Sequence, residues 1–138
     1  MKLQILKDGQ EEIKNYSHVV ASDNKVDISH IMNNECERIL ATDVLDCFTI
    51  GGVPELLQAL ASKLRLGGEM SVGGTEIRLL CKSIINGSIT PEEGAEVISG
   101  LYSASSLQFV QDALEKLGLT VVDTHMNGVH FEVKVRRV

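Results

Sequence analysis

Short apolar runs separated by polar turns predict strands and helices that alternate along the chain. Runs at 2–7 and 16–22 are typical of strands, and a near-continuous apolar run at 37–45 predicts a third. Apolar residues at successive positions in that third run indicate a parallel strand covered on both faces. A further short strand is expected at 69–72.

Apolar residues three to four positions apart predict four helices. Each helix begins at a residue that can cap its first turn or at a proline, and three of them end at a glycine. These boundary residues are, in chain order, Pro54 and Gly67, Thr75 and Gly87, Thr90 and Pro91, and Ser105 or Ser106 with Gly118. Lys63 and Arg65 are expected in the last turn of the first helix.

The C-terminal residues 119–137 form two runs of alternating polarity around Asn127-Gly128, a dipeptide typical of hairpin turns. Strands that alternate with helices and end in a hairpin predict an α/β fold. We therefore expect a Rossmann-like three-layer sandwich, with a mostly parallel sheet that ends in an antiparallel hairpin. The whole chain, 1–138, is expected to form one domain.

Two histidines flank the predicted hairpin turn. If Asn127 and Gly128 occupy the turn, His125 faces His130 across the hairpin. A facing histidine pair can bind a metal ion, whereas two polar residues at a strand end need no ligand. We favour the second interpretation and predict no metal site.

Composition and charge limit the classes of partner. The 138 residues carry a net charge of −6 without a block of like charge, which argues against a nucleic-acid interface. No apolar run approaches the ~18 residues of a membrane span. The N-terminus lacks the apolar core of a signal peptide, so we expect a cytoplasmic protein. Three isolated cysteines indicate neither a zinc site nor a redox dithiol.

Two acidic residues lie at the end of the strand predicted at 37–45. In open parallel sheets the ligand crevice lies beyond the carboxyl ends of the strands, so a carboxylate there can take part in catalysis. It can equally well cap or solvate the strand end. Asp43 and Asp46 are therefore the candidates for catalysis, and Gly73-Gly74 is expected at the edge of the same crevice.

Several segments, in their order and spacing, resemble the second half of class I S-adenosylmethionine-dependent methyltransferases. "DVLDCF" (43–48), "KLRLGG" (63–68) and "MSVGG" (70–74) are similar to the ends of a strand, a helix and the next strand in that family. The stretch 112–137 resembles the family's C-terminal end. The likeness covers about 36–138 and is greatest for small phage-type members, which would place the protein in a host cytoplasm.

The resemblance implies S-adenosylmethionine as the cofactor. In the family a glycine-rich loop after the first strand passes under the cofactor, an acidic residue after the second binds the ribose, and a later loop contacts the adenine. The positions implied here for cofactor binding are Asp8, Gly9, Asp23, Asp27, Ile28 and Asp43. Residues 1–35 are a shortened version of the family's cofactor half, with one glycine in the loop and no room for the first helix.

The shortened half predicts a degenerate methyltransferase-like protein that acts as a binding or regulatory subunit, with weak or no cofactor binding. The alternative is an active minimal enzyme that transfers a methyl group from S-adenosylmethionine to an unknown acceptor. A small structural α/β protein of unrelated role is a third reading. Missing helices would leave one sheet face bare, and exposed apolar patches usually mark interfaces. We therefore expect a homo-oligomer or a protein partner on that face.

Overall fold

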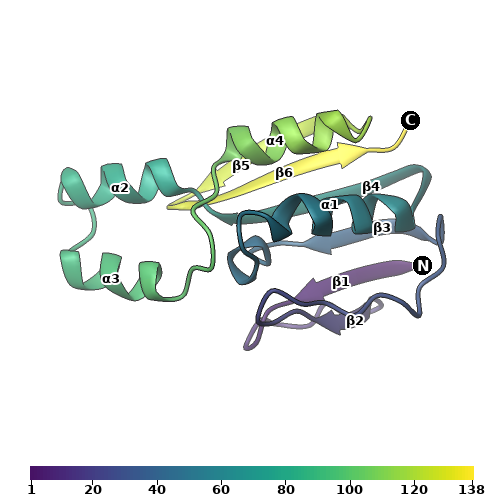
Figure 1. Ribbon diagram of the computed structural model, residues 1–138, viewed down its shortest axis with the longest axis horizontal. Helices are drawn as coiled ribbons and strands as arrows, with labels where there is room; N and C mark the ends of the chain where they lie inside the picture. Colours follow the sequence, from purple (N-terminus) through teal and green to yellow (C-terminus); the bar gives the residue numbers. More distant parts are fainter.

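All 138 residues are described by a computed structural model built around one six-stranded sheet. The strands are β1 (Lys2–Leu6), β2 (Ser17–Val20), β3 (Cys36–Ala41), β4 (Leu64–Thr75), β5 (Thr120–Asn127) and β6 (His130–Arg136). They lie in the order β2-β1-β3-β4-β6-β5 (Figure 1). The first four are parallel, and β6 and β5 add an antiparallel hairpin. The predicted Rossmann-like fold is confirmed.

The helices fall into two groups. They are a short 3-10 helix η1 (Leu45–Cys47), followed by α1 (Gly52–Lys63), α2 (Ile77–Ile85), α3 (Pro91–Ser99) and α4 (Leu107–Lys116). Helices α1 and α4 lie along the sheet, whereas α2 and α3 form a pair that projects beyond its end (Figure 1). No helix has the length and apolar character that a membrane span requires.

The core lies between one face of the sheet and the inner sides of α1 and α4. Alternate residues of each central strand point to this face, because successive side chains of a strand point to opposite sides. Most of the fully buried core side chains are aliphatic, and they include Leu3, Ile5, Ile39, Val72, Val133, Leu57, Leu60, Val110 and Leu114.

The opposite face of the sheet carries no helix, in agreement with the shortened N-terminus. Its side chains include Lys2, Gln4, Arg38, Glu69, Ser71, Lys134 and Arg136, which the strand pairing aligns in rows. Hydrogen bonds from Lys134 and Arg136 lower the pKa of the Glu69 carboxyl. This face is charged rather than apolar, so the apolar patch expected there is wrong. The homo-oligomer or partner inferred from it stays a prediction.

The loop between β1 and β2 crosses the charged face where a helix would otherwise lie. Gln4, only 3% exposed, holds this loop with both ends of its amide. Its Nε2 donates to the carbonyl of Glu11 (3.1 Å), and its Oε1 accepts from the N–H of Ile13 (2.8 Å). One buried side chain thus supplies the polar contacts that position the loop.

Replacing Gln4 with leucine is expected to lower the free energy of unfolding by about 1–2 kcal/mol, because both loop contacts are lost while the volume is kept. Urea unfolding measures the loss, and amide hydrogen exchange at Ile13 should accelerate. Gln108→Leu is the control, because Gln108 is exposed on α4 and bonds only Asp112. Equal effects of the two substitutions would refute the anchoring role of Gln4.

Helix and strand boundaries follow local signals where these are strong. Thr90 caps α3 with Pro91 in its first turn, Ser106 caps α4, and Gly87 and Gly118 follow α2 and α4 with positive φ, all as predicted. The predicted end of α1 is wrong, because the helix ends at Lys63. Leu64 is fully buried and already pairs with Cys36 of β3, so the chain passes directly from helix to strand.

Four further boundaries differ from prediction. Helix α1 begins at Gly52, two residues before the predicted start at Pro54. β3 ends at Ala41, because Asp43 has φ +60°, which a strand does not accommodate, and Asp46 lies in η1. Thr75 belongs to β4, and Glu76 caps α2 in its place. The turn of the C-terminal hairpin lies one residue later than predicted.

The hairpin turn differs from the predicted turn in position and type. Asn127 pairs with His130, so Gly128 and Val129 form the turn. Gly128 alone has positive φ (+62°), which is the pattern of a type II′ turn rather than the type I′ turn that Asn-Gly at the centre would give. His125 therefore lies opposite Glu132, and the predicted facing pair of histidines is wrong.

Candidate functional site

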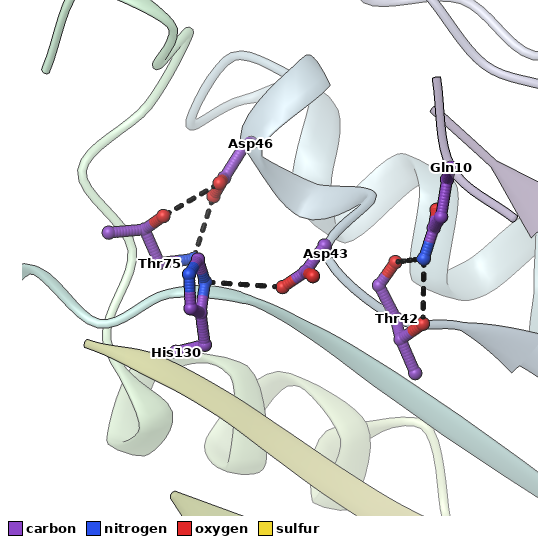
Figure 2. Close-up of polar contacts among 6 residues, drawn as sticks. All are labelled: Gln10, Thr42, Asp43, Asp46, Thr75 and His130. Carbon is purple, nitrogen blue, oxygen red and sulfur yellow. Dashed lines mark hydrogen bonds and ion pairs between the residues drawn. The ribbon is translucent and has the colours of Figure 1, made fainter. Parts of the chain in front are cut away.

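The strand order reverses between β1 and β3, and in open α/β sheets such a switch point is where ligands bind. Here the gap between the two strand ends is bridged by Gln10. Its Nε2 donates to the carbonyl oxygen (3.1 Å) and the hydroxyl (3.0 Å) of Thr42, beyond β3. Its Oε1 accepts from the N–H of Lys7, beyond β1 (3.2 Å). Figure 2 shows the Gln10 amide reaching Thr42.

Gly9 has a turn role in this bridge. It has φ +82°, and the N–H of Gln10 returns to the carbonyl of Lys7 (3.1 Å), which closes a tight turn. A Cβ at Gly9 would meet no atom within 4 Å, so no neighbour requires the absence of a side chain here. The glycine is needed for its backbone conformation, and Asp8 beside it is exposed.

The predicted ribose-binding residue, Asp23, already has a partner. The hydroxyl of Tyr102 donates to Asp23 Oδ1 at 2.5 Å, and this contact raises the pKa of Tyr102. The next residue, Asn24, bonds the carbonyl of Cys47 through its N–H (2.8 Å) and accepts from the N–H of Thr49 through Oδ1 (3.0 Å). The loop after β2 is thus joined to the segment that follows β3.

Asp27 and Ile28, the predicted adenine-side residues, line an open pocket of about 470 Å³ between the 24–28 loop and α1. The pocket is half apolar, with Phe48 and Leu56 among its walls. Asp27 accepts from the N–H and hydroxyl of Ser29, which lowers its pKa.

Asp43 contributes to a second pocket, of about 280 Å³, which lies between Thr42-Asp43 and the β5–β6 hairpin. Its Oδ1 lies 3.3 Å from Nδ1 of His130 on β6, and the two side chains point toward each other in Figure 2. His125 and Glu132 also line this pocket. Its chemistry is that of an imidazole oriented by a carboxylate, with further acceptors around it.

Asp46, the other catalytic candidate, is a structural residue in this arrangement. It is 8% exposed, and its two oxygens accept from the N–H (2.8 Å) and the hydroxyl (2.7 Å) of Thr75 (Figure 2). A Cβ on Gly74 would lie 2.8 Å from Asp46 Oδ1, so the glycine permits this approach. A side chain at Gly73 is excluded for a different reason, because an added Cβ would lie 2.2 Å from the carbonyl oxygen of Phe131 on β6.

The structure does not bring the six predicted cofactor residues into one cavity. Asp27 and Ile28 share one pocket, Asp43 lines another, and Asp23 bonds Tyr102, while Asp8 and Gly9 form an exposed turn. Sequence reasoning missed Gln10, Thr42 and Tyr102. It also missed the Asp43–His130 pair, whose only sequence signal was a histidine next to the predicted turn. No group of three or more histidine, cysteine or acidic side chains is arranged to bind a metal.

Comparison with known proteins gives a consistent answer for the fold. No protein-family model matches the chain, and no curated protein matches it in sequence. Among solved structures, a SAM-dependent methyltransferase from Archaeoglobus fulgidus has a TM-score of 0.65 at 12% identity, over 96% of this chain and 75% of that protein. One from Mesorhizobium loti has a TM-score of 0.62 at 10% identity, over 92% and 72%. The chain has the class I methyltransferase fold.

The chain spans only part of the length of some similar structures. A protein from Pyrococcus horikoshii has a TM-score of 0.59 at 14% identity over 90% of this chain, yet only 60% of that protein is covered. A Thermotoga maritima methyltransferase is covered over 65% of its length. The chain therefore spans less than two thirds of these two structures.

The fold makes S-adenosylmethionine the cofactor to compare with the residues present. Gln10 bridges the crevice at the switch point, Tyr102 bonds the predicted ribose acid, and Asn24 joins the two flanking loops. Of the residues in these contacts, only Asp23 is among the positions that the resemblance assigns to the cofactor. A cofactor at the implied position would have to replace the contact of Asp23 with Tyr102.

Proposed function

We propose that this protein is a degenerate member of the methyltransferase fold that does not use S-adenosylmethionine and acts as a binding or regulatory protein. The observation that supports it is the Gln10 bridge between the ends of β1 and β3. A ligand between the two strand ends would have to break the two hydrogen bonds from Gln10 to Thr42. A partly buried hydrogen bond that is lost without replacement costs about 1 kcal/mol or more.

A second function, that of a minimal methyltransferase, has one observation in its favour. The pocket beside Asp27 and Ile28 is open and half apolar, as a site for a nucleoside would be. The two proposals differ in whether this pocket alone can retain the cofactor when the crevice beside it is bridged.

We expect calorimetric titration with S-adenosylmethionine and S-adenosylhomocysteine, at up to about 1 mM ligand, to give no binding heat and no thermal shift. The reason is that the crevice contacts would have to be exchanged for cofactor contacts of similar strength. An active methyltransferase in the same buffer is the positive control.

Saturable binding at up to about 1 mM ligand would overturn the proposal, because enzymes commonly have KM values between about 1 μM and 1 mM. In that case Asp27→Asn and Asp23→Asn would locate the site. Loss of binding in Asp27→Asn alone would support the minimal methyltransferase, with the nucleoside in the 24–28 pocket.

A further inference from the structure

We propose that the pocket between Thr42-Asp43 and the β5–β6 hairpin binds a small organic cation, such as a primary amine. The pocket has a volume of about 280 Å³, close to the lower end of typical ligand sites. It is separate from the 24–28 pocket, and the two share no residue.

Strand pairing builds one wall of this amine pocket. Asn127 pairs with His130, and His125 pairs with Glu132. Because side chains two positions apart in a strand point to the same side, all four side chains lie on one face of the hairpin. Gly73 of β4 is the partner of Glu132 on its other side and contributes no side chain to this face.

Three of the six polar side chains in the pocket have no partner within the protein. The side chains of Glu132, His125 and Asn127 make no hydrogen bond or ion pair with another residue, whereas Asp43 contacts His130 at 3.3 Å. Their acceptor atoms therefore remain available to a ligand. Thr42 is already bonded to Gln10 and forms the boundary with the crevice.

The charge of the lining favours a cation. Asp43 and Glu132 contribute two carboxylates, and no lysine or arginine lines the pocket. Lys134, two residues further along β6 on the same face, contacts Glu69 at 2.9 Å and is not directed at Glu132. With neutral imidazoles the lining carries two negative charges, and an anion would be repelled by both.

The Asp43–His130 contact adds a directional acceptor. A carboxylate next to Nδ1 favours the tautomer with the proton on Nδ1, which leaves Nε2 as an acceptor. An ammonium group has three N–H donors and can bond a carboxylate and an imidazole nitrogen together. This arrangement is the reason for preferring an amine over a metal ion, for which the side chains are not arranged.

Three probes of equal length test the charge preference: 1,4-diaminobutane, 1,4-butanediol and succinate. The imidazole carbon-proton signals of His125 and His130 are followed by NMR at pH 8. The diamine is expected to shift both histidines with saturation in the low-millimolar range or below. Affinity for the diol should be at least about tenfold weaker, because it lacks the ionic attraction. Succinate should leave both signals in place.

Two substitutions of equal charge change identify the site. Glu132→Gln is expected to weaken diamine binding about fivefold, because one exposed carboxylate partner is lost. Glu96→Gln is the control, because Glu96 is exposed on α3 and lies outside the pocket. Unchanged backbone spectra establish that both variants are folded.

The inference would be overturned if neither histidine signal shifted at a diamine concentration tenfold above the low-millimolar range. Equal shifts with the diol, or equal weakening of diamine binding by Glu96→Gln, would also overturn it. The inference does not rest on the proposed function. Thr42 is the one residue that the amine pocket shares with the Gln10 bridge. A negative S-adenosylmethionine titration with positive diamine binding would support both proposals. Cofactor binding without diamine binding would contradict both.

Discussion

Replacing Glu76 with alanine is expected to lower the free energy of unfolding by about 2–4 kcal/mol. Glu76 is 3% exposed at the junction of β4 and α2, and its two carboxylate oxygens serve two helices. Oε1 accepts from the N–H of Arg78 in the first turn of α2 (2.8 Å), and Oε2 accepts from the N–H of Leu107 at the start of α4 (2.5 Å).

The size of the effect follows from these two contacts. Each N–H that loses its partner in a partly buried position costs about 1–2 kcal/mol, and a negative charge near two helix N-termini is favourable as well. Urea unfolding gives the free energy, and hydrogen exchange at Arg78 and Leu107 should accelerate together. Faster exchange at only one of these two amides would mean that the carboxylate supports a single helix.

Thr90→Ala provides the comparison for Glu76. Thr90 caps α3 alone, at an exposed position, through a bond from the N–H of Glu93. Its removal is expected to cost about 1 kcal/mol. If Glu76→Ala costs no more than Thr90→Ala, the double cap is not a major source of stability.

The elements that the sequence predicts well are those defined by neighbouring residues. Thr90 and Pro91, Ser106, and the glycines after α2 and α4 act within one helical turn, so their signals are visible in the sequence. The order of strands and helices then restricts the fold to a few topologies, and the likeness of several segments to one family selects among them.

The contacts at the candidate site could not be predicted in this way, because they join distant residues. Tyr102 lies 79 positions from Asp23, and Gln10 lies 32 from Thr42. An acidic residue in a loop gives no indication of whether a ligand or another side chain will take its hydrogen bond. The resemblance implies a ligand crevice at the carboxyl ends of the strands, but it does not predict that Gln10 joins the ends of β1 and β3.

The hairpin shows how a small local difference changes the chemistry. Asn127-Gly128-Val129 is compatible with two turns, and the choice between them moves every cross-strand partner by two residues. With the observed turn, His125 faces Glu132 and not His130. That shift replaces a pair of imidazoles by an alternation of imidazole and carboxylate, which is the basis of the amine pocket.

Replacing Asp46 with alanine is expected to lower the free energy of unfolding by about 2–4 kcal/mol. The substitution leaves the buried N–H and hydroxyl of Thr75 without their acceptor, and charge-assisted hydrogen bonds of this kind contribute about 1.5–3 kcal/mol. Asp43→Ala is the control, because Asp43 is more exposed and contacts only His130. It should change stability by less than about 1 kcal/mol.

Gly74→Ala tests the same contact from the other side. The new methyl group would lie 2.8 Å from Asp46 Oδ1 and 3.2 Å from the Cβ of Leu45, so the carboxylate must move and the substitution should cost about 1–3 kcal/mol. Because both substitutions disrupt one interaction, the double variant should be less destabilised than the sum of the two. Additive losses would mean that Gly74 is required for another reason. A coupled loss would assign Asp46 to holding η1 against the end of β4, and would leave Asp43 as the carboxylate available for chemistry.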